Sequence, residues 1–163
     1  MDALWFAELA TSLEASTVAA ALREKAWPYP LANLLHVLGV ALLIGAIVAL
    51  DLRLLGVCKF SVSADGAASL LVPVAVLGLV IAIPSGSLLF VVEAVPLSRH
   101  PLMQVKGVLI LLGLMNALLL QIRARARLRW WDEAPPAGGR WQAAFSLLTW
   151  VGAAVCGRLI AYV

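Results

Sequence analysis

The stretch GAASLLVPVAVLGLVIAIPSGSLLFVV, residues 66–92, runs between Asp65 and Glu93 without a charged side chain. A helix needs about 20 mostly apolar residues to cross the hydrocarbon core of a bilayer. This stretch is long enough, although Pro73 and Pro84 lie inside it. Bilayer helices tolerate proline where neighbouring helices satisfy the freed carbonyl groups. We therefore predict a membrane-spanning helix here, bent at its prolines.

Three other segments have the same apolar character. One is interrupted only by Lys106 and another only by Arg158. Four spans joined by short connections favour an integral membrane four-helix bundle of the all-α class, with up-down-up-down topology. The predicted spans are about 31–52, 67–92, 101–122 and 142–163.

The composition of the whole chain agrees with this prediction. Of its 163 residues, 63% are hydrophobic and 13% are charged, whereas soluble domains carry about 45–50% apolar and about 25% charged residues. The chain has too few charges to cover a water-facing surface, and its length suits one domain. We expect the lipid bilayer to be its main partner and expect no binding to nucleic acid.

Residues 1–27 form a separate segment before the bundle, which occupies 28–163. Acidic residues and the lack of a long apolar run argue against a signal peptide. We predict a surface-lying amphipathic segment, formed as two short helices with Ser16 capping the second. Its apolar residues Leu4, Trp5, Phe6, Leu9 and Leu13 alternate with Glu8, Ser12 and Glu14.

Lysine and arginine residues predict the orientation, because cytoplasmic loops are enriched in both. Loops 51–66 and 121–141 carry seven of them, and the opposite side carries three. We therefore expect a bacterial inner-membrane protein with both termini on the periplasmic side. The basic run before Trp130 and Trp131 is then a membrane-surface feature with an aromatic belt. The seven are Arg53, Lys59, Arg123, Arg125, Arg127, Arg129 and Arg140, and the three are Arg23, Lys25 and Arg99.

Small residues recur at helical spacing in each predicted span, which lets helix backbones approach closely. We expect one narrow contact face per helix and little room for a water-filled pore. Cys58 and Cys156 lie on opposite sides of the bilayer, so we interpret both as apolar packing residues. The small residues are Ala32, Gly39 and Ala46; Gly78, Ala82 and Gly86; Gly113 and Ala117; and Ala153, Gly157 and Ala161.

Polar residues inside the spans mark candidate functional positions. His36, Lys106 and Arg158 each lie five residues from the outer end of their span, which is about 8 Å at 1.5 Å per residue. Ser85 lies at the outer end of the second span. The helical period predicts that all four face the bundle, with Tyr162 covering the Arg158 guanidinium.

Two cations and a histidine in one apolar layer repel each other unless an anion joins them. Glu93 alone cannot satisfy both Lys106 and Arg158. Either an anionic ligand binds here or both side chains extend to the outer surface. For His36, the simplest alternative is a neutral imidazole hydrogen-bonded to a backbone carbonyl or to Ser85.

A more specific hypothesis adds His100, since His36 and His100 are the two histidines of the chain. A heme b in a helix bundle needs an axial imidazole, commonly two, and cations for its propionates. We expect His36 to be the stronger iron ligand and His100 a second one, although His100 is also compatible with a solvated loop residue. A quinone or a lipid anion is the alternative ligand. The propionate partners would be Arg99, Lys106 and Arg158.

Asp51 and Arg53 close the first span, where we expect an interfacial ion pair or caps for neighbouring helix ends. Only apolar and small residues separate Asp51 from His36, which argues against a proton pump or an ion-coupled transporter. Motifs of metalloproteases, serine hydrolases and nucleotide-binding proteins are missing from the sequence. A hydrolytic enzyme is therefore not expected.

The motifs LHVLG (35–39), DLRLLG (51–56) and GRLIAY (157–162), together with Lys106, resemble an uncharacterised family of small bacterial four-helix membrane proteins. The resemblance covers the chain from about Tyr29 to its end. It implies the topology and an inner-membrane location, and it assigns no activity. Similar sequences often have asparagine at the position of His100, which implies that His36, Lys106 and Arg158 form the core of any site. A looser likeness to four-helix b-type cytochromes and copper-resistance membrane proteins concerns the fold alone.

Two functions follow as hypotheses. The first is an electron-transfer subunit that binds heme b or a quinone in the outer third of the bundle and serves a periplasmic partner. The second is a non-catalytic accessory subunit of a larger membrane complex. A transporter of anions or metals is disfavoured, because the sequence offers no polar pathway through the bundle.

Overall fold

The computed structural model describes residues 2–57, 61–134 and 138–162. These residues are 86% helical and contain no strand, which confirms the all-α class. Predictions for Cys58, Lys59, Pro135 and Pro136 lie outside the described residues. The elements are α1 Asp2–Glu14, α2 Thr17–Glu24, α3 Pro28–Leu55, α4 Ala64–Val92, α5 Ala94–Arg99, α6 Pro101–Ala124, the 3-10 helix η1 Arg125–Trp130, and α7 Gly139–Leu159.

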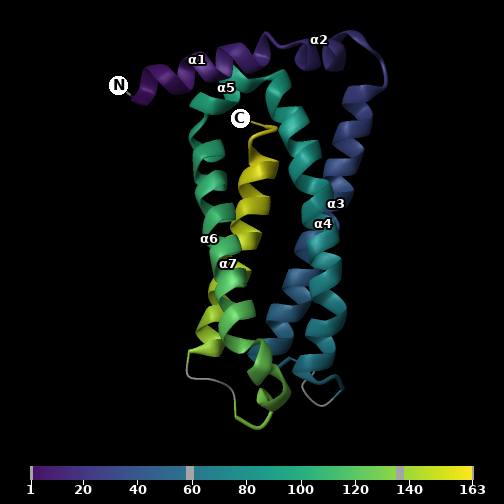
Figure 1. The fold of residues 1–163 in the computed structure, drawn as a ribbon, viewed down its shortest axis with the longest axis vertical. Helices are drawn as coiled ribbons and strands as arrows, with labels where there is room; N and C mark the ends of the chain where they lie inside the picture. The colour runs from purple at the N-terminus through teal and green to yellow at the C-terminus, as the bar shows by residue number, and fades with distance from the viewer. Residues whose placement is uncertain (1, 58–60, 135–137, 163) are drawn as a thin grey trace.

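Four long helices, α3, α4, α6 and α7, run along the long axis of the molecule and alternate in direction (Figure 1). Among the residues that the structure describes, three helices are long and apolar enough to cross a membrane: Pro28–Leu55, Ala64–Val92 and Pro101–Ile122. The chain therefore has the helices of a membrane protein. The fourth predicted span, 142–163, falls largely on α7, which is not among these three.

The boundaries of the long helices differ from the prediction for local reasons. Helix α3 begins at Pro28 rather than near Leu31, because proline is accepted at the first positions of a helix. It ends at Gly56, whose φ of 110° is a left-handed conformation that favours glycine. Helix α7 ends at Leu159, and the chain continues in turns to Tyr162.

The small-residue faces expected on the first two spans meet each other in the structure. A Cβ atom added to Gly39 would lie 2.7 Å from the Ala82 backbone nitrogen. A Cβ atom added to Gly78 would lie 2.5 Å from the Leu43 backbone nitrogen. These distances are too short for any side chain, so α3 and α4 pack backbone against backbone.

Helices α6 and α7 form a second close pair. The Trp150 indole covers Gly113, and a Cβ atom there would lie 2.8 Å from the indole Cε2 atom. The side-chain amides of Asn116 and Gln142 each donate a 3.2 Å hydrogen bond to the other residue's backbone carbonyl. Helix α7 also packs against α3, which joins the two pairs.

The two N-terminal helices lie across one end of the long helices, as Figure 1 shows. Ser16 caps α2 by accepting from the Ala19 N–H, which confirms the predicted cap. The Arg23 guanidinium donates to the carbonyls of Val92 and Glu14, and the Glu14 carboxylate accepts from the Val95 N–H. Polar bonds therefore tie this segment to the ends of α4 and α5.

The opposite end of the molecule holds an apolar core. Trp131 is 3% exposed and donates its indole N–H to the Leu54 carbonyl. The prediction that it belongs to an aromatic belt with Trp130 is therefore wrong for Trp131, because tertiary packing buries it; Trp130 itself is 63% exposed. The core residues here are Leu50, Leu54, Ala64, Ala67, Ala68, Leu128, Trp131 and Ala143.

Candidate functional site

His36 lies on α3 and is held against α4. Its imidazole packs on Gly86, where an added Cβ atom would lie 2.7 Å from the ring Cε1 atom. Its Nδ1 atom lies 3.0 Å from the Ala82 carbonyl oxygen. A carbonyl only accepts, so Nδ1 carries the proton and the lone pair of the neutral ring is on Nε2.

Ser85 joins the same cluster, as the sequence predicts, and is 4% exposed. Its hydroxyl lies 3.4 Å from His36 Nδ1 and donates to the Ile81 carbonyl at 2.6 Å. The predicted alternative for His36 is a neutral ring hydrogen-bonded to a backbone carbonyl or to Ser85, and the Ala82 carbonyl is the nearer partner of Nδ1. That anchoring fixes the ring and leaves Nε2 for another partner.

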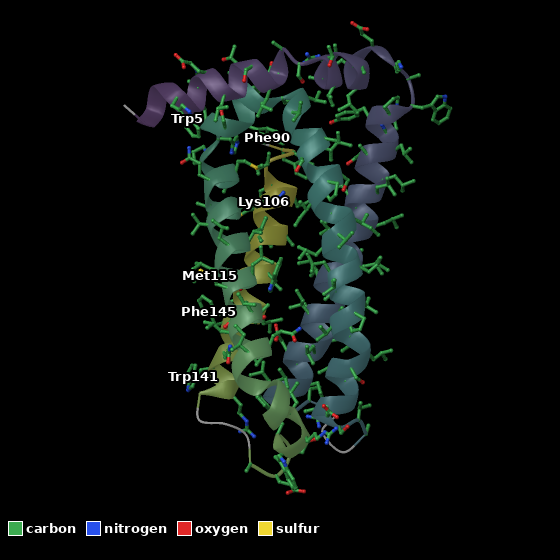
Figure 2. The ribbon with its side chains drawn as sticks, in the orientation of Figure 1. Trp5, Phe90, Lys106, Met115, Trp141 and Phe145 are labelled. Atoms are coloured by element: carbon green, nitrogen blue, oxygen red, sulfur yellow. The ribbon has the colours of Figure 1, made fainter. Side chains whose placement is uncertain are left out.

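Lys106 approaches from α6, near the end that α1 covers (Figure 2). Its ammonium would lie 3.1 Å from a Cβ atom added to Gly157, so its side chain runs along α7. Lys106 lies close enough to His36 for their charges to interact, and close to the thiol of buried Cys156. Within the described residues no carboxylate forms an ion pair with it. The structure thus brings His36, Ser85 and Lys106 into one layer.

Arg158 does not join this layer in the predicted way. Its side chain is exposed, and its guanidinium donates to the Tyr162 hydroxyl and lies 4.8 Å from the centre of the Tyr162 ring. The expected cover by Tyr162 is confirmed, whereas the expectation that Arg158 faces the bundle is wrong. A long guanidinium side chain reaches the interface more easily than it is desolvated between helices.

His100 and Arg99 lie in the connection between α5 and α6. Arg99 is exposed in the last turn of α5. The Nδ1 atom of His100 accepts from the Leu102 N–H at 3.3 Å. In the neutral ring the other nitrogen, Nε2, then carries the proton. A protonated ring nitrogen has no lone pair to offer a metal. The bonds of His36 go to α4 and those of His100 stay in this connection, so the structure does not join the two histidines.

A second set of polar residues lies at the other end of the molecule. Arg53 forms an ion pair with Asp132 at 2.5 Å, and among the described residues it forms none with Asp51. Asp132 also accepts from the Ala64 N–H, and Arg53 donates to the Val62 carbonyl, so the pair closes the start of α4. The backbone N–H at the start of α4 is therefore bonded by Asp132, and not by Asp51 or Arg53 as expected.

Asp51 has a different neighbour, since the Ser146 side chain of α7 lies beside its carboxylate. Asp51, Ser146 and Trp150 line a cavity of about 600 Å³ between the long helices. The walls of this cavity are mainly apolar, and the expectation of little room for a water-filled pore stays a prediction. Ser146 and Trp150 lie four residues apart on α7, a helical spacing that places both on one face and is the signal in the sequence for this cavity.

Searches with known proteins identify no relative: no protein-family model, curated protein or solved structure matches the chain. The family resemblance therefore stays a prediction drawn from the motifs. The candidate site is described by its own geometry. It consists of an anchored imidazole, whose Nε2 atom has no hydrogen-bond partner among the described residues, and a neighbouring ammonium group.

Proposed function

We propose that the chain is a small membrane-embedded electron-transfer subunit whose ligand, a heme b or a quinone, binds at His36. The observation that carries this proposal is the hydrogen bond from His36 Nδ1 to the Ala82 carbonyl, which directs the lone pair to Nε2. Axial histidines commonly donate their other ring N–H to a backbone carbonyl, which orients the ring and raises its basicity.

The residues around His36 fit one axial ligand better than two. A bound heme b would supply one-electron chemistry at its iron. His36 would hold the iron through Nε2, and the Lys106 ammonium would pair with a propionate. His100 contributes no second imidazole in this arrangement, because its Nδ1 atom is the acceptor in its own turn.

A quinone is the second candidate ligand of the same two groups. The Lys106 ammonium would donate to a quinone carbonyl, and His36 Nε2 would accept from the hydroxyl of the reduced form. Both ligands place the redox chemistry in the layer nearest the N-terminal helices. The accessory-subunit hypothesis remains the alternative that needs no ligand.

The proposed setting is a four-span up-down bundle in a bacterial inner membrane, with α7 as the fourth span and both termini in the periplasm. Three apolar helices support the membrane assignment. The side-by-side position of α7 with α6 and α3 supports its inclusion. The excess of lysine and arginine in the two loops opposite the termini supports the orientation, and the motif resemblance supports the bacterial family.

A reduced-minus-oxidised visible spectrum of the full chain in mild detergent tests the heme. We expect a Soret shift and an α-band, both lost in His36→Ala and both kept in the matched variant His100→Ala. Loss in His100→Ala as well would contradict the single-ligand site. A flat spectrum at full heme supply would exclude heme.

The quinone is tested on the same preparation by extracting the co-purified lipids and measuring their quinone content. We expect His36→Ala to lower the quinone-to-protein ratio relative to His100→Ala if quinone is the ligand. When neither pigment nor quinone is present in the wild type, the electron-transfer proposal fails and the accessory subunit becomes the better explanation.

A further inference from the structure

The cavity beside Asp51 is separate from the His36 layer. Asp51 follows His36 by fifteen positions on α3, which corresponds to about 22 Å along a helix. Its walls come from α3, α4, α6, η1 and α7 and consist mainly of leucine, valine and alanine side chains. With a volume of about 600 Å³ it falls in the range of small-molecule sites.

Asp51 brings an incompletely bonded carboxylate to this cavity. The residue is 2% exposed, and the Ser146 side chain of α7 lies beside its carboxylate. Within the described residues its Oδ2 atom is buried and has no hydrogen-bond partner. Arg53, the cation two positions away, is engaged by Asp132. A buried acceptor without a donor costs free energy of desolvation. A donor group on a bound molecule would recover that free energy.

Trp150 brings an unpartnered donor to the same cavity. It is 3% exposed, and its indole N–H has no acceptor among the described residues. Its ring is seated on Gly113, which holds the indole in place. Ser146 and Trp150 lie four residues apart on α7 and thus on one face, about 5–6 Å apart. Asp51 and Trp150 both line this cavity, which brings an unpartnered acceptor oxygen and an unpartnered N–H donor of the described residues to one binding site.

A hydroxyl group matches both atoms, because it donates one hydrogen bond and accepts others. An ammonium group could satisfy Asp51 but not Trp150, and an ether could satisfy Trp150 but not Asp51. We propose that this cavity binds a lipid-soluble molecule whose hydroxyl group donates to Asp51 and accepts from the Trp150 indole. Its hydrocarbon body lies along the apolar walls. Phenols, hydroquinones and long-chain alcohols all share this chemistry. The proposal does not depend on the ligand of His36.

The test uses the full chain in nanodiscs and tritiated 4-dodecylphenol, measured by scintillation proximity. We expect saturable binding, with 4-dodecylanisole, the methyl ether that cannot donate, competing about tenfold more weakly than unlabelled 4-dodecylphenol. Competition by dodecylhydroquinone and by farnesol identifies the source. Tighter competition by the former indicates a ring, tighter competition by the latter indicates an alcohol, and both support the site.

Two conservative variants connect the binding to the two atoms. Asp51→Asn and Trp150→Phe are each expected to weaken 4-dodecylphenol binding about tenfold, since each removes one hydrogen bond and keeps the shape. Glu133→Gln and Trp141→Phe are the matched controls, because both residues are exposed and lie outside the cavity lining. Both controls are expected to bind as the wild type does.

Three results would overturn the proposal. Equal competition by the phenol and its methyl ether would show that no hydroxyl is recognised. Tighter competition by dodecylamine, lost in Asp51→Asn and kept in Trp150→Phe, would assign a cation site. Absence of saturable binding in the wild type would leave water as the partner of both atoms.

Discussion

At the scale of single residues, several polar side chains bond to backbone carbonyls of other segments of the chain. His36 uses the Ala82 carbonyl, Arg53 uses the Val62 carbonyl, and Trp131 uses the Leu54 carbonyl. An unpaired donor or acceptor that is buried raises the free energy of the folded chain. The available partners therefore determine the position of each buried polar side chain. Asp51 and Trp150 stand out because each keeps one buried polar atom without a partner in the described part of the chain.

The Arg53–Asp132 pair is open to a direct test at this scale. Asp132→Ala leaves Arg53, 5% exposed, without its carboxylate and removes the acceptor of the Ala64 N–H. We expect the free energy of unfolding to fall by about 2–3 kcal/mol, below the full value for a buried pair because the Asp132 side chain is 34% exposed. Unfolding in mixed detergent and dodecyl sulfate micelles measures it. Glu133→Ala, an exposed neighbour, is expected to change little, and equal stability of the two variants would contradict the role of the pair.

At the scale of elements, the helices associate as two close pairs, α3 with α4 and α6 with α7. Lipid offers no hydrophobic driving force for helix association, so close backbone approach through small residues is what stabilises such pairs. The periodic small residues predict a contact face on α3 and on α4, and these faces meet in the structure. The glycine positions do not predict which large side chain packs on Gly113. That side chain is Trp150, which belongs to α7 and is distant from Gly113 in the sequence.

Two glycine positions on different helices make this argument quantitative. Gly78→Ala places a Cβ atom 2.5 Å from the Leu43 backbone, and the helices must separate, so we expect a loss of about 1–3 kcal/mol in unfolding free energy. Gly45→Ala on α3 meets nothing within 4 Å. There we expect no loss, and a gain of up to about 1 kcal/mol from helix propensity. The same micelle titration compares both variants; a Gly78→Ala protein as stable as Gly45→Ala would contradict backbone contact.

At the scale of the whole molecule, both ends of the described chain lie at one end of the long helices, and the turn after η1 lies at the other (Figure 1). The N-terminal helices are bonded to the ends of α4 and α5, so they form a cover over the His36 end. Outward faces of the long helices are apolar along their length. Exposed examples on α6 are Val108, Leu111, Met115, Leu118 and Ile122.

The proposed topology predicts the sidedness of two exposed positions. In a chain with both native cysteines replaced by serine, Thr11→Cys on α1 and Glu133→Cys after η1 are expected to face opposite sides of the membrane. A membrane-impermeant maleimide added to intact spheroplasts should label the first and not the second. Labelling of both from outside would show that the long helices do not all cross the membrane.

The sequence by itself determined the helical class, the positions of three apolar spans and the small-residue contact faces of α3 and α4. Apolar length and glycine spacing are local properties, and the physics of a bilayer acts on them directly. Only the tertiary structure decided the polar pairings: Arg53 with Asp132, Asp51 with Ser146, and His36 separate from His100. These pairings depend on which helix faces meet, and a side chain takes the nearest partner in space, whatever its distance along the chain.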